Sequence, residues 1–261
     1  MQNNTIKRRV SRKRKFIELI ERVANIRIYR NLPRGIDISQ DISMSFPWYS
    51  IDVVFDVGSN VGQSAKYFLN CFSNAKIYCF EPVRDTFVQL QKNTEKINRI
   101  QPIQIALGSY NGKGDMVIRG QITRGLSFLL DRSKDSQRRE GIQTEVVNVM
   151  TLDQLCKDRK ISQISYLKID AEGGDLEVLE GGKSMLNAQR IDFVEVEAGM
   201  YVKNKDHVPF EILKDFLESR GYLLYGIYEQ WYESKREPIL RRTNPVYVSS
   251  HIIEMNTRQS G

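Results

Sequence analysis

Cysteine is scarce in this sequence and does not occur in pairs that could hold a metal or a disulfide framework. The chain has 261 residues and three cysteines, Cys71, Cys79 and Cys156, with no C-x-x-C motif. An odd count at these spacings supports neither a disulfide scaffold nor a structural zinc site. A chain of this length can bury a core that needs no such crosslink, and we expect a cytoplasmic protein in a reducing compartment.

Long apolar runs are also missing. No stretch approaches the length of a membrane span, and residues 1–10 are too polar for a signal peptide. The sequence therefore predicts no transmembrane segment.

Positive charge is concentrated at the N-terminus, where residues 7–9 and 12–15 are all Lys or Arg within a chain of formal net charge +7. Such a block can contact nucleic acid or anionic lipid, although basic blocks are more often solvated tails. We expect a flexible arm over 1–15. Apolar residues at helical spacing predict a helix over 16–30, which either docks on the main domain, the favoured alternative, or lies on a membrane surface.

A strand, a glycine-rich turn and a helix are predicted around residues 53–62. A β-branched run leads to Asp56, and Gly58, Ser59, Asn60 and Gly62 follow. Glycines there allow a tight turn close to a ligand, which would face the N–H groups at the start of the next helix. The pattern is G-x-x-x-G, so the dinucleotide fingerprint is incomplete, and without a Walker lysine a phosphoryl-transfer NTPase is disfavoured.

Strand and helix patterns then alternate, which indicates an α/β fold with a mostly parallel sheet. We expect residues 36–50 to be irregular, a helix over 175–186, and Trp231 and Tyr232 in a loop. The segment 110–150 is expected to form an antiparallel insertion over the ligand-binding end of the sheet. The expected strands of the sheet are 51–57, 75–80, 103–107, 164–170, 191–197, 222–228 and 246–253. We divide the chain into a basic arm with a helical extension (1–46) and a main domain (47–261).

A second acid strengthens the ligand-binding interpretation. Glu81 ends the second expected strand, twenty-five residues after Asp56. In doubly wound sheets an acid at this point accepts hydrogen bonds from ribose hydroxyls. The alternative is a carboxylate that caps the next helix before Pro82.

Four segments, in this order, resemble the FkbM-type methyltransferases: Phe55–Gly62, Phe80–Pro82, Ala106–Gly108 and Leu167–Gly173. The resemblance implies a Rossmann-like class I methyltransferase fold with a seven-stranded sheet. It also implies use of S-adenosylmethionine and methylation of a hydroxyl, often on a sugar or natural product. By position, Asp56, Gly58, Ser59, Asn60 and Gly62 would surround the methionine end of the cofactor, Glu81 would hold the ribose, and Ala106 and Leu107 would flank the adenine.

Charged residues near the ends of the fourth and fifth strands are candidates for the chemistry. Lys168 and Asp170 share one strand face, as do Glu195 and Glu197. Because buried charges need partners, we expect Lys168 to pair with Glu195, while Asp170 and Glu197 project into the site. The alternative is a purely structural ion-pair network.

Two further residues are catalytic candidates with open alternatives. Glu172, beside two glycines, either caps a helix or lines the site. His207 is a potential base near neutral pH, although a surface histidine is the more common case. Asp170, Glu172 and Glu197 could also hold Mg²⁺ through oxygen ligands, but their spacing is not diagnostic.

The sequence thus predicts an S-adenosylmethionine-dependent O-methyltransferase that acts on a sugar or glycan precursor, with Trp231 and Tyr232 near the acceptor. A natural-product methyltransferase and a cofactor-binding protein without turnover are the alternatives. A nucleic-acid methyltransferase is disfavoured, because no N-P-P-Y motif is present. Nothing in the sequence indicates the oligomeric state.

Overall fold

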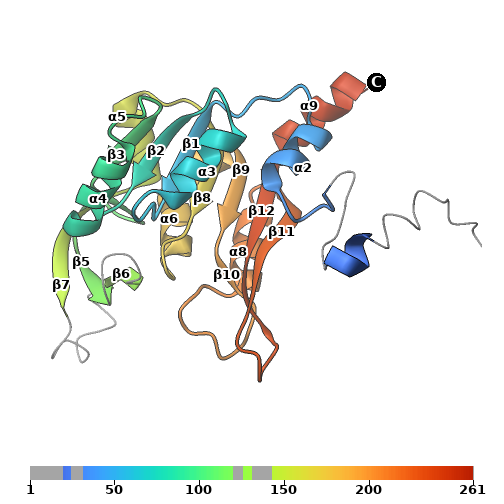
Figure 1. Ribbon diagram of the computed structural model, residues 1–261. Helices are drawn as coiled ribbons and strands as arrows, with labels where there is room; N and C mark the ends of the chain where they lie inside the picture. The colour runs from blue at the N-terminus through green and yellow to red at the C-terminus, as the bar shows by residue number, and fades with distance from the viewer. Residues whose placement is uncertain (1–19, 25–31, 120–125, 131–142, 261) are drawn as a thin grey trace, which may run out of the picture.

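The computed structural model describes residues 20–24, 32–119, 126–130 and 143–260 (Figure 1). The basic arm expected at 1–15 falls outside these ranges, as does most of the helix expected at 16–30. Residues 20–24 are helical, with Ile20 half-buried and Val23 79% exposed, and the rest of the helix that we expected to dock lies outside the described ranges. In the described ranges no helix is long and apolar enough to cross a membrane.

A mostly parallel sheet forms the centre of the described structure. Its strand order is β10-β12-β9-β8-β1-β2-β3, with β11 paired to β12. Only the pairings made by β12 are antiparallel. The strands are β1 (Val53–Val57), β2 (Lys76–Phe80), β3 (Ile100–Ile103), β8 (Ile164–Ile169), β9 (Ile191–Val196), β10 (Ala198–Gly199), β11 (Tyr222–Tyr232) and β12 (Leu240–Ser249).

The described sheet has eight strands in seven positions. β10 continues β9 along β12 without a change of register, because Glu195 pairs with Val246 and Ala198 with Thr243. The mostly parallel sheet expected from the sequence is therefore confirmed, and the fifth expected strand is interrupted at Glu197.

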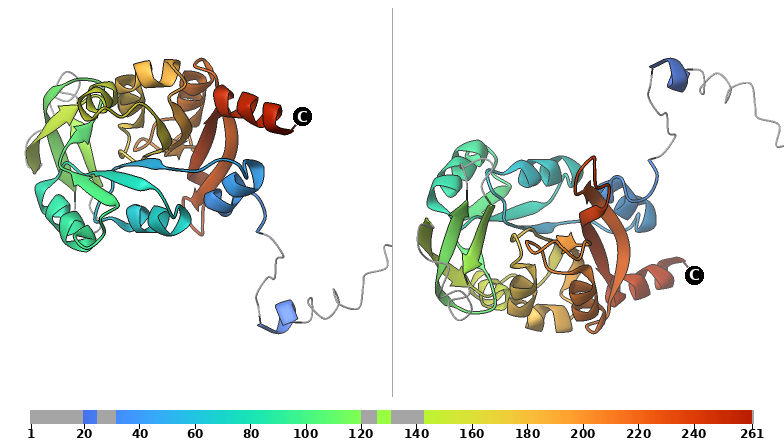
Figure 2. Two further views of the ribbon diagram at one scale, coloured as in Figure 1. Left: turned by 90° about the horizontal axis from the view of Figure 1, so that it is seen from above. Right: turned by 90° about the horizontal axis from the view of Figure 1, so that it is seen from below.

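Helices cover both faces of the sheet and give three layers (Figure 2). Each face has its own hydrophobic core, one built on Phe55, Leu167 and Val194, the other on Val54, Tyr166 and Phe193. The first core is covered by α5 (Leu152–Arg159), α6 (Asp175–Gly181), α7 (Lys183–Asn187) and α8 (Phe210–Glu218), the second by α2 (Ile38–Ser45), α3 (Gln63–Cys71), α4 (Arg84–Thr94) and α9 (Ser250–Ser260). Alternate residues of each strand thus pack into different layers. The three cysteines are free thiols.

The expectation of an irregular segment over 36–50 is wrong, because α2 lies there. Asp37 caps this helix, and its Oδ1 accepts hydrogen bonds from the backbone N–H groups of Ser39 and Gln40. Ile38, Ile42 and Phe46 are buried in the second core. The core therefore extends upstream of residue 47, where we expected the main domain to begin.

The third strand also differs from expectation. Ile100–Ile103 pairs with β2, whereas Ala106–Leu107 forms β4 in a different sheet. β3 is an edge strand, and an edge tolerates Pro102, which cannot donate a ladder hydrogen bond. The expected strand at 103–107 is therefore wrong.

Three expectations in the second half of the chain are wrong. The helix expected at 175–186 is broken at Gly181–Gly182 into α6 and α7, and a Cβ on Gly181 would lie 2.1 Å from the Gly108 carbonyl oxygen. The last strand ends at Ser249, and α9 begins at Ser250. Trp231 and Tyr232 belong to β11 and not to a loop.

The insertion is a second, four-stranded sheet of order β4-β7-β5-β6. It comprises β4 (Ala106–Leu107), β5 (Gly112–Arg119), β6 (Leu126–Leu130) and β7 (Thr144–Met150), and β5 is antiparallel to both of its neighbours. Val83, Met116 and Val147 pack together, and Glu145 Oε1 accepts a hydrogen bond from the Arg84 N–H. The insertion therefore lies beside the carboxyl end of β2, below α4 in Figure 1.

Candidate functional site

The turn between β1 and α3 is held in a conformation that glycine favours. Gly58, Asn60 and Gly62 have φ angles of 78°, 49° and 95°. A Cβ on Gly58 would lie 1.9 Å from the carbonyl oxygen of Asp170, and the Gly58 N–H donates to the Phe80 carbonyl at 3.0 Å. This turn is thus locked between β2 and the end of β8, and only glycine fits at position 58.

Asp56 lies beneath this turn and is fully buried. Its Oδ2 accepts a hydrogen bond from Ser64 Oγ at 2.6 Å, while its Oδ1 lacks a hydrogen bond and lies 4.0 Å from Lys168 Nζ. Burial raises the pKa of Asp56, and the charge of Lys168 opposes that shift. Ser59 Oγ donates to the Asp56 carbonyl oxygen at 2.6 Å, so its side chain is used within the turn.

Glu81 ends at the same edge of the sheet and is 7% exposed. Its Oε1 accepts a hydrogen bond from the Val83 N–H at 2.9 Å, at the start of α4. Burial raises its pKa to about 7, against the effect of backbone hydrogen bonds from Val83 and Asn60. The capping alternative is therefore present in the structure, and the carboxylate also faces the turn that contains Asn60.

Ala106 and Leu107 are both 6% exposed. Ala106 packs with Val83 and Val149, whereas Leu107 belongs to the core that contains Phe80. Their side chains fill hydrophobic clusters, so little of either residue is open to an adenine.

The expected ion pair between Lys168 and Glu195 is not formed. These residues are register partners on β8 and β9, but Lys168 Nζ donates to Asp170 Oδ2 at 3.0 Å. Glu195 accepts hydrogen bonds from the Tyr166 hydroxyl at 2.5 Å and from Asn244 Nδ2 at 2.9 Å. Each carboxylate oxygen of Glu195 thus accepts a hydrogen bond from a neutral donor. Lys168 therefore pairs with Asp170 instead and orients it.

Asp170 follows β8 directly, and its carboxylate remains partly open to solvent. Burial acts to raise its pKa, but the charge and hydrogen bond of Lys168, with Arg242 and His207, outweigh burial and hold the pKa below its usual value. Asp170 is therefore an anion at neutral pH, with one oxygen fixed by Lys168.

Three of the four catalytic candidates meet at the carboxyl ends of the strands. One ligand atom each from Glu172, Glu197 and His207 lies within 4.8 Å of the others. His207 Nε2 is 2.9 Å from Glu197 Oε2, and Nδ1 is 3.0 Å from Asn204 Oδ1. With its side chain only 6% exposed, His207 is not a surface histidine, and both of its ring nitrogens face oxygens of the protein.

Glu172 has the least common backbone conformation of the three. Its φ is 50°, and the next residue, Gly173, approaches the Asp206 carbonyl so closely that a Cβ would lie 2.5 Å from its oxygen. Burial, and then the charge of Asp170, raise the pKa of Glu172. A carboxylate whose pKa is raised towards neutrality is suited to accept a proton.

The structure adds residues that sequence reasoning missed. Arg242 on β12 contacts the Glu197 carboxylate, and Asp175 Oδ1 accepts the Glu197 N–H at 3.0 Å. The sequence around Arg242 and Asp175 contains no motif that marks them as site residues. They reach the site only because strand pairing and the path of the chain bring distant segments together.

The donor set does not suit Mg²⁺. Glu197 is already paired with Arg242 and His207, Asp170 with Lys168, and one of the three clustered donors is a ring nitrogen. Mg²⁺ prefers oxygen ligands in regular octahedral geometry, so these residues fit it poorly.

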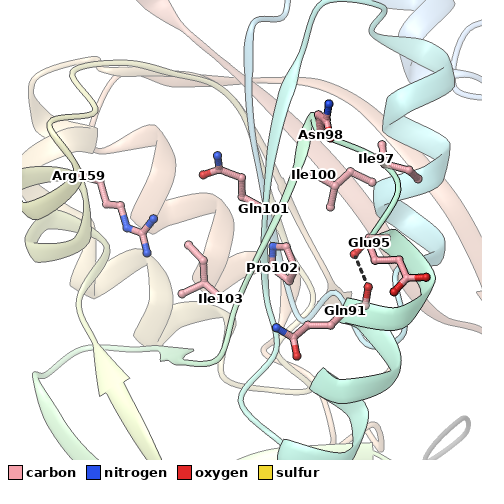
Figure 3. A pocket seen from close by; sticks show the side chains of 10 residues that line it. Gln91, Glu95, Ile97, Asn98, Ile100, Gln101, Pro102, Ile103 and Arg159 are labelled. Atoms are coloured by element: carbon pink, nitrogen blue, oxygen red, sulfur yellow. Dashed lines mark hydrogen bonds between the residues drawn. The ribbon is translucent and has the colours of Figure 1, made fainter.

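A pocket of about 500 Å³ lies elsewhere, on the outer side of β3 (Figure 3). Gln91 and Glu95 from one side and Arg159 from the other are among its lining residues. None of the candidate cofactor or catalytic residues lines this pocket, so we assign it no part in the site.

The chain is similar to several known proteins in sequence and in structure. The family described as the methyltransferase FkbM domain matches residues 56–224. Hexuronic acid methyltransferase AglP of Haloferax volcanii is 29% identical over 154 residues, 59% of this chain and 59% of that protein's length. 2-O-methyltransferase NoeI of Sinorhizobium fredii is 24% identical over 179 residues, 64% of this chain and 71% of that protein. Among solved structures, the METTL16 methyltransferase domain aligns with a TM-score of 0.47 and 11% identity, over 90% of this chain and 78% of that one.

Proposed function

Since the chain belongs to the methyltransferase FkbM domain family, we propose that it is an S-adenosylmethionine-dependent O-methyltransferase. One observation carries the proposal: the Gly58 turn is in backbone contact with Asp170. A cofactor seated on that turn would therefore lie beside the carboxylates at the ends of β8 and β9.

The cofactor would be held from β1 and β2. Gly58, Asn60 and Gly62 give the turn its close backbone approach, and the buried Oδ1 of Asp56 lacks a hydrogen-bond donor. Glu81 would accept hydrogen bonds from the ribose hydroxyls, and the backbone around Ala106 and Leu107 would lie on the adenine side. When bound, S-adenosylmethionine supplies a methyl group on a sulfonium sulfur.

The chain's own residues would align the acceptor and remove its proton. Asp170, fixed by Lys168, would hold the acceptor hydroxyl, and Glu172 would take its proton as the acceptor oxygen forms a bond to the methyl carbon. The bound cofactor would give up its methyl group in the same step, and the electron pair of the broken carbon–sulfur bond would stay on sulfur. His207 and Arg242 would hold the Glu197 carboxylate in place.

A hydroxyl on a sugar or glycan precursor is the proposed acceptor. The names of two relatives, a hexuronic acid methyltransferase and a 2-O-methyltransferase, support this class. A natural-product acceptor, or loss of turnover, are the alternatives. We place the reaction in the cytoplasm, where three free thiols are stable.

Calorimetry followed by a transfer assay tests the proposal. The full chain should bind S-adenosylmethionine and S-adenosylhomocysteine, and should transfer a labelled methyl group to glycosides. If the chain binds these compounds but transfers no methyl group to any hydroxyl acceptor, it is a cofactor-binding protein of the same fold. If it binds neither compound, the proposal is wrong.

The basic residues at 7–15 would at most add a peripheral contact with anionic lipid. Cosedimentation with phosphatidylserine vesicles, with and without these residues, tests that contact.

A further inference from the structure

We propose that Arg242 and Trp231 form a subsite for a negatively charged group on the sugar acceptor. The inference rests on the proposed function and makes it more specific: the acceptor would be an acidic sugar and not a neutral one. It starts from two side chains that no catalytic step above requires to touch the substrate.

The two residues are brought together by strand pairing. Arg242 of β12 is the register partner of Trp231 on β11 and of Gly199 on β10. The Arg242 guanidinium carbon lies 5.3 Å from the centroid of the Trp231 ring, and Arg242 also contacts Glu197. A continuous strip thus leads from the catalytic carboxylates to Trp231.

Arg242 has N–H donors that its contact with Glu197 does not use. Glu197 is 1% exposed, so its carboxylate needs a cation nearby, and Arg242 provides it through Nη1. A guanidinium carries five N–H donors in a plane, and the Arg242 side chain remains 30% exposed. The donors that do not face Glu197 can bind a carboxylate or phosphate, a pairing for which the planar guanidinium is suited.

Trp231 adds the part of the subsite that contacts the sugar ring. Its side chain is 55% exposed although it is large and apolar. An exposed aromatic face beside a charged donor can pack against the C–H face of a sugar and remove apolar surface from water. The hairpin of β11 and β12 extends beyond the carboxyl ends of the parallel strands in Figure 1, where an acceptor must enter.

Neighbouring contacts hold Arg242 in position. Arg241 Nη2 donates to Asp206 Oδ2 at 2.7 Å, and its Nε lies 3.4 Å from Glu233 Oε2. The Arg241 carbonyl accepts hydrogen bonds from the Met200 N–H and Asn204 Nδ2. The backbone at the subsite is therefore fixed before an acceptor arrives, which lowers the entropy lost on binding.

Binding of defined glycosides to the chain saturated with S-adenosylhomocysteine tests the subsite. The probes are methyl glucuronoside, glucose 6-phosphate and methyl glucoside, which carry a carboxylate, a phosphate and no charge. We expect the two anionic probes to bind more tightly than methyl glucoside. The relative affinity of the first two tells which anion the subsite prefers.

Because Arg242 also holds Glu197, Arg242→Gln is expected to weaken every probe, but it should weaken the anionic probes roughly tenfold to hundredfold more than methyl glucoside, the range of one charge-assisted hydrogen bond. Arg242→Lys, which keeps the charge, should recover part of the loss. The matched control Arg236→Gln removes the same charge from the exposed tip of the hairpin and should leave all three affinities unchanged. Trp231→Ala should weaken every probe, whereas Tyr232→Ala, which removes an equally exposed ring from the same strand, should not.

Two results would contradict the subsite. In the first, the unmodified chain binds charged and neutral probes with equal affinity. In the second, Arg242→Gln reduces the affinity for all three probes by the same factor. Methyl transfer to neutral sugars would then keep the proposed function. Failure to bind S-adenosylhomocysteine would instead remove the proposed function, and this inference with it.

Discussion

Single glycines and carboxylates determine how closely the Gly58 turn approaches the residues that follow β8. Gly58 has a positive φ, and its Cα lies against the Asp170 carbonyl. Burial raises the pKa of Glu81 and of Glu172, whereas the charge and hydrogen bond of Lys168 hold the pKa of Asp170 below its usual value. Predictions about these positions therefore concern local geometry and charge.

Gly58→Ala should destabilise the fold by about 2–4 kcal/mol, because the new Cβ meets a backbone atom and the φ is unfavourable. Urea unfolding measures the change. Gly182→Ala is the control: its φ is −107°, and its Cβ would lie 3.2 Å from Leu152 Cδ2 and 3.6 Å from its nearest backbone atom, the Leu179 carbonyl oxygen. Equal stability of the two variants would contradict the close contact at Gly58.

Glu81 should make cofactor binding depend on pH. Its pKa of about 7 is raised in the folded chain, so the stability that it contributes is present below about pH 4.5 and is lost as pH rises through 7. Ribose hydroxyls donate to the ionised form, and the affinity for S-adenosylhomocysteine should rise between pH 6 and 8. Calorimetry across this range should give a flat profile for Glu81→Gln; a pH dependence that persists in this variant would exclude Glu81 as its source.

Asp170→Asn and Glu172→Gln should both reduce turnover more than cofactor affinity, and Glu172→Gln, which removes the proposed proton acceptor, should lower turnover by about 10²–10⁴-fold. Because burial and Asp170 raise the pKa of Glu172, only Glu172→Gln should abolish the acidic limb of the pH–rate profile. Wild-type turnover in either variant would assign that residue a structural role.

At the scale of elements, strands were predicted better than short or late helices. The runs at β1, β8 and β9 are mostly apolar and almost entirely buried, as central parallel strands are, so their existence could be read from the sequence. α2 has only eight residues and α9 follows β12 without a break, so neither shows a long helical period. β11 has register shifts between Leu224 and Gly226 and between Tyr228 and Trp231, which interrupt the alternation that predicts a strand.

Phe46→Ala should cost about 3–5 kcal/mol of folding free energy, because this side chain ends α2 and is 2% exposed within the second core. Its ring lies 5.6 Å from that of Phe193 in an edge-to-face arrangement. Met44→Ala, at a side chain 50% exposed on the same helix, is the control and should cost little. Thermal and urea unfolding measure both, and equal losses would show that α2 does not belong to the core.

At the scale of the whole molecule, the predictable part of the site is the part encoded in contiguous motifs. Asp56, Gly58 and Asn60 follow one strand and Glu81 another, and the topology of a parallel sheet brings their ends to one edge. Arg242, Asp175 and Asn204 reach Glu197 and His207 only through strand pairing and loop packing far along the chain. Nothing local marks them, which is also why the pairing of Lys168 with Glu195 was predicted wrongly.

S-adenosylhomocysteine should stabilise the whole chain by mass action, by about 2.7 kcal/mol at a concentration one hundred times its Kd. Because the Gly58 turn joins β1 to the end of β8, the gain should raise the midpoint of a single cooperative transition. Calorimetric melting with the ligand and with adenosine alone checks this; a ligand-dependent transition confined to part of the molecule would show that the site is not coupled to the rest of the sheet.

The contact between Gly58 and the Asp170 carbonyl has a consequence for the newborn protein. In a polypeptide emerging from the ribosome, the segment that contains Gly58 appears well before Asp170. The turn therefore lacks the backbone carbonyl that it packs against until β8 and Asp170 have been synthesised. A growing chain should therefore be unable to bind S-adenosylhomocysteine until β8 has emerged.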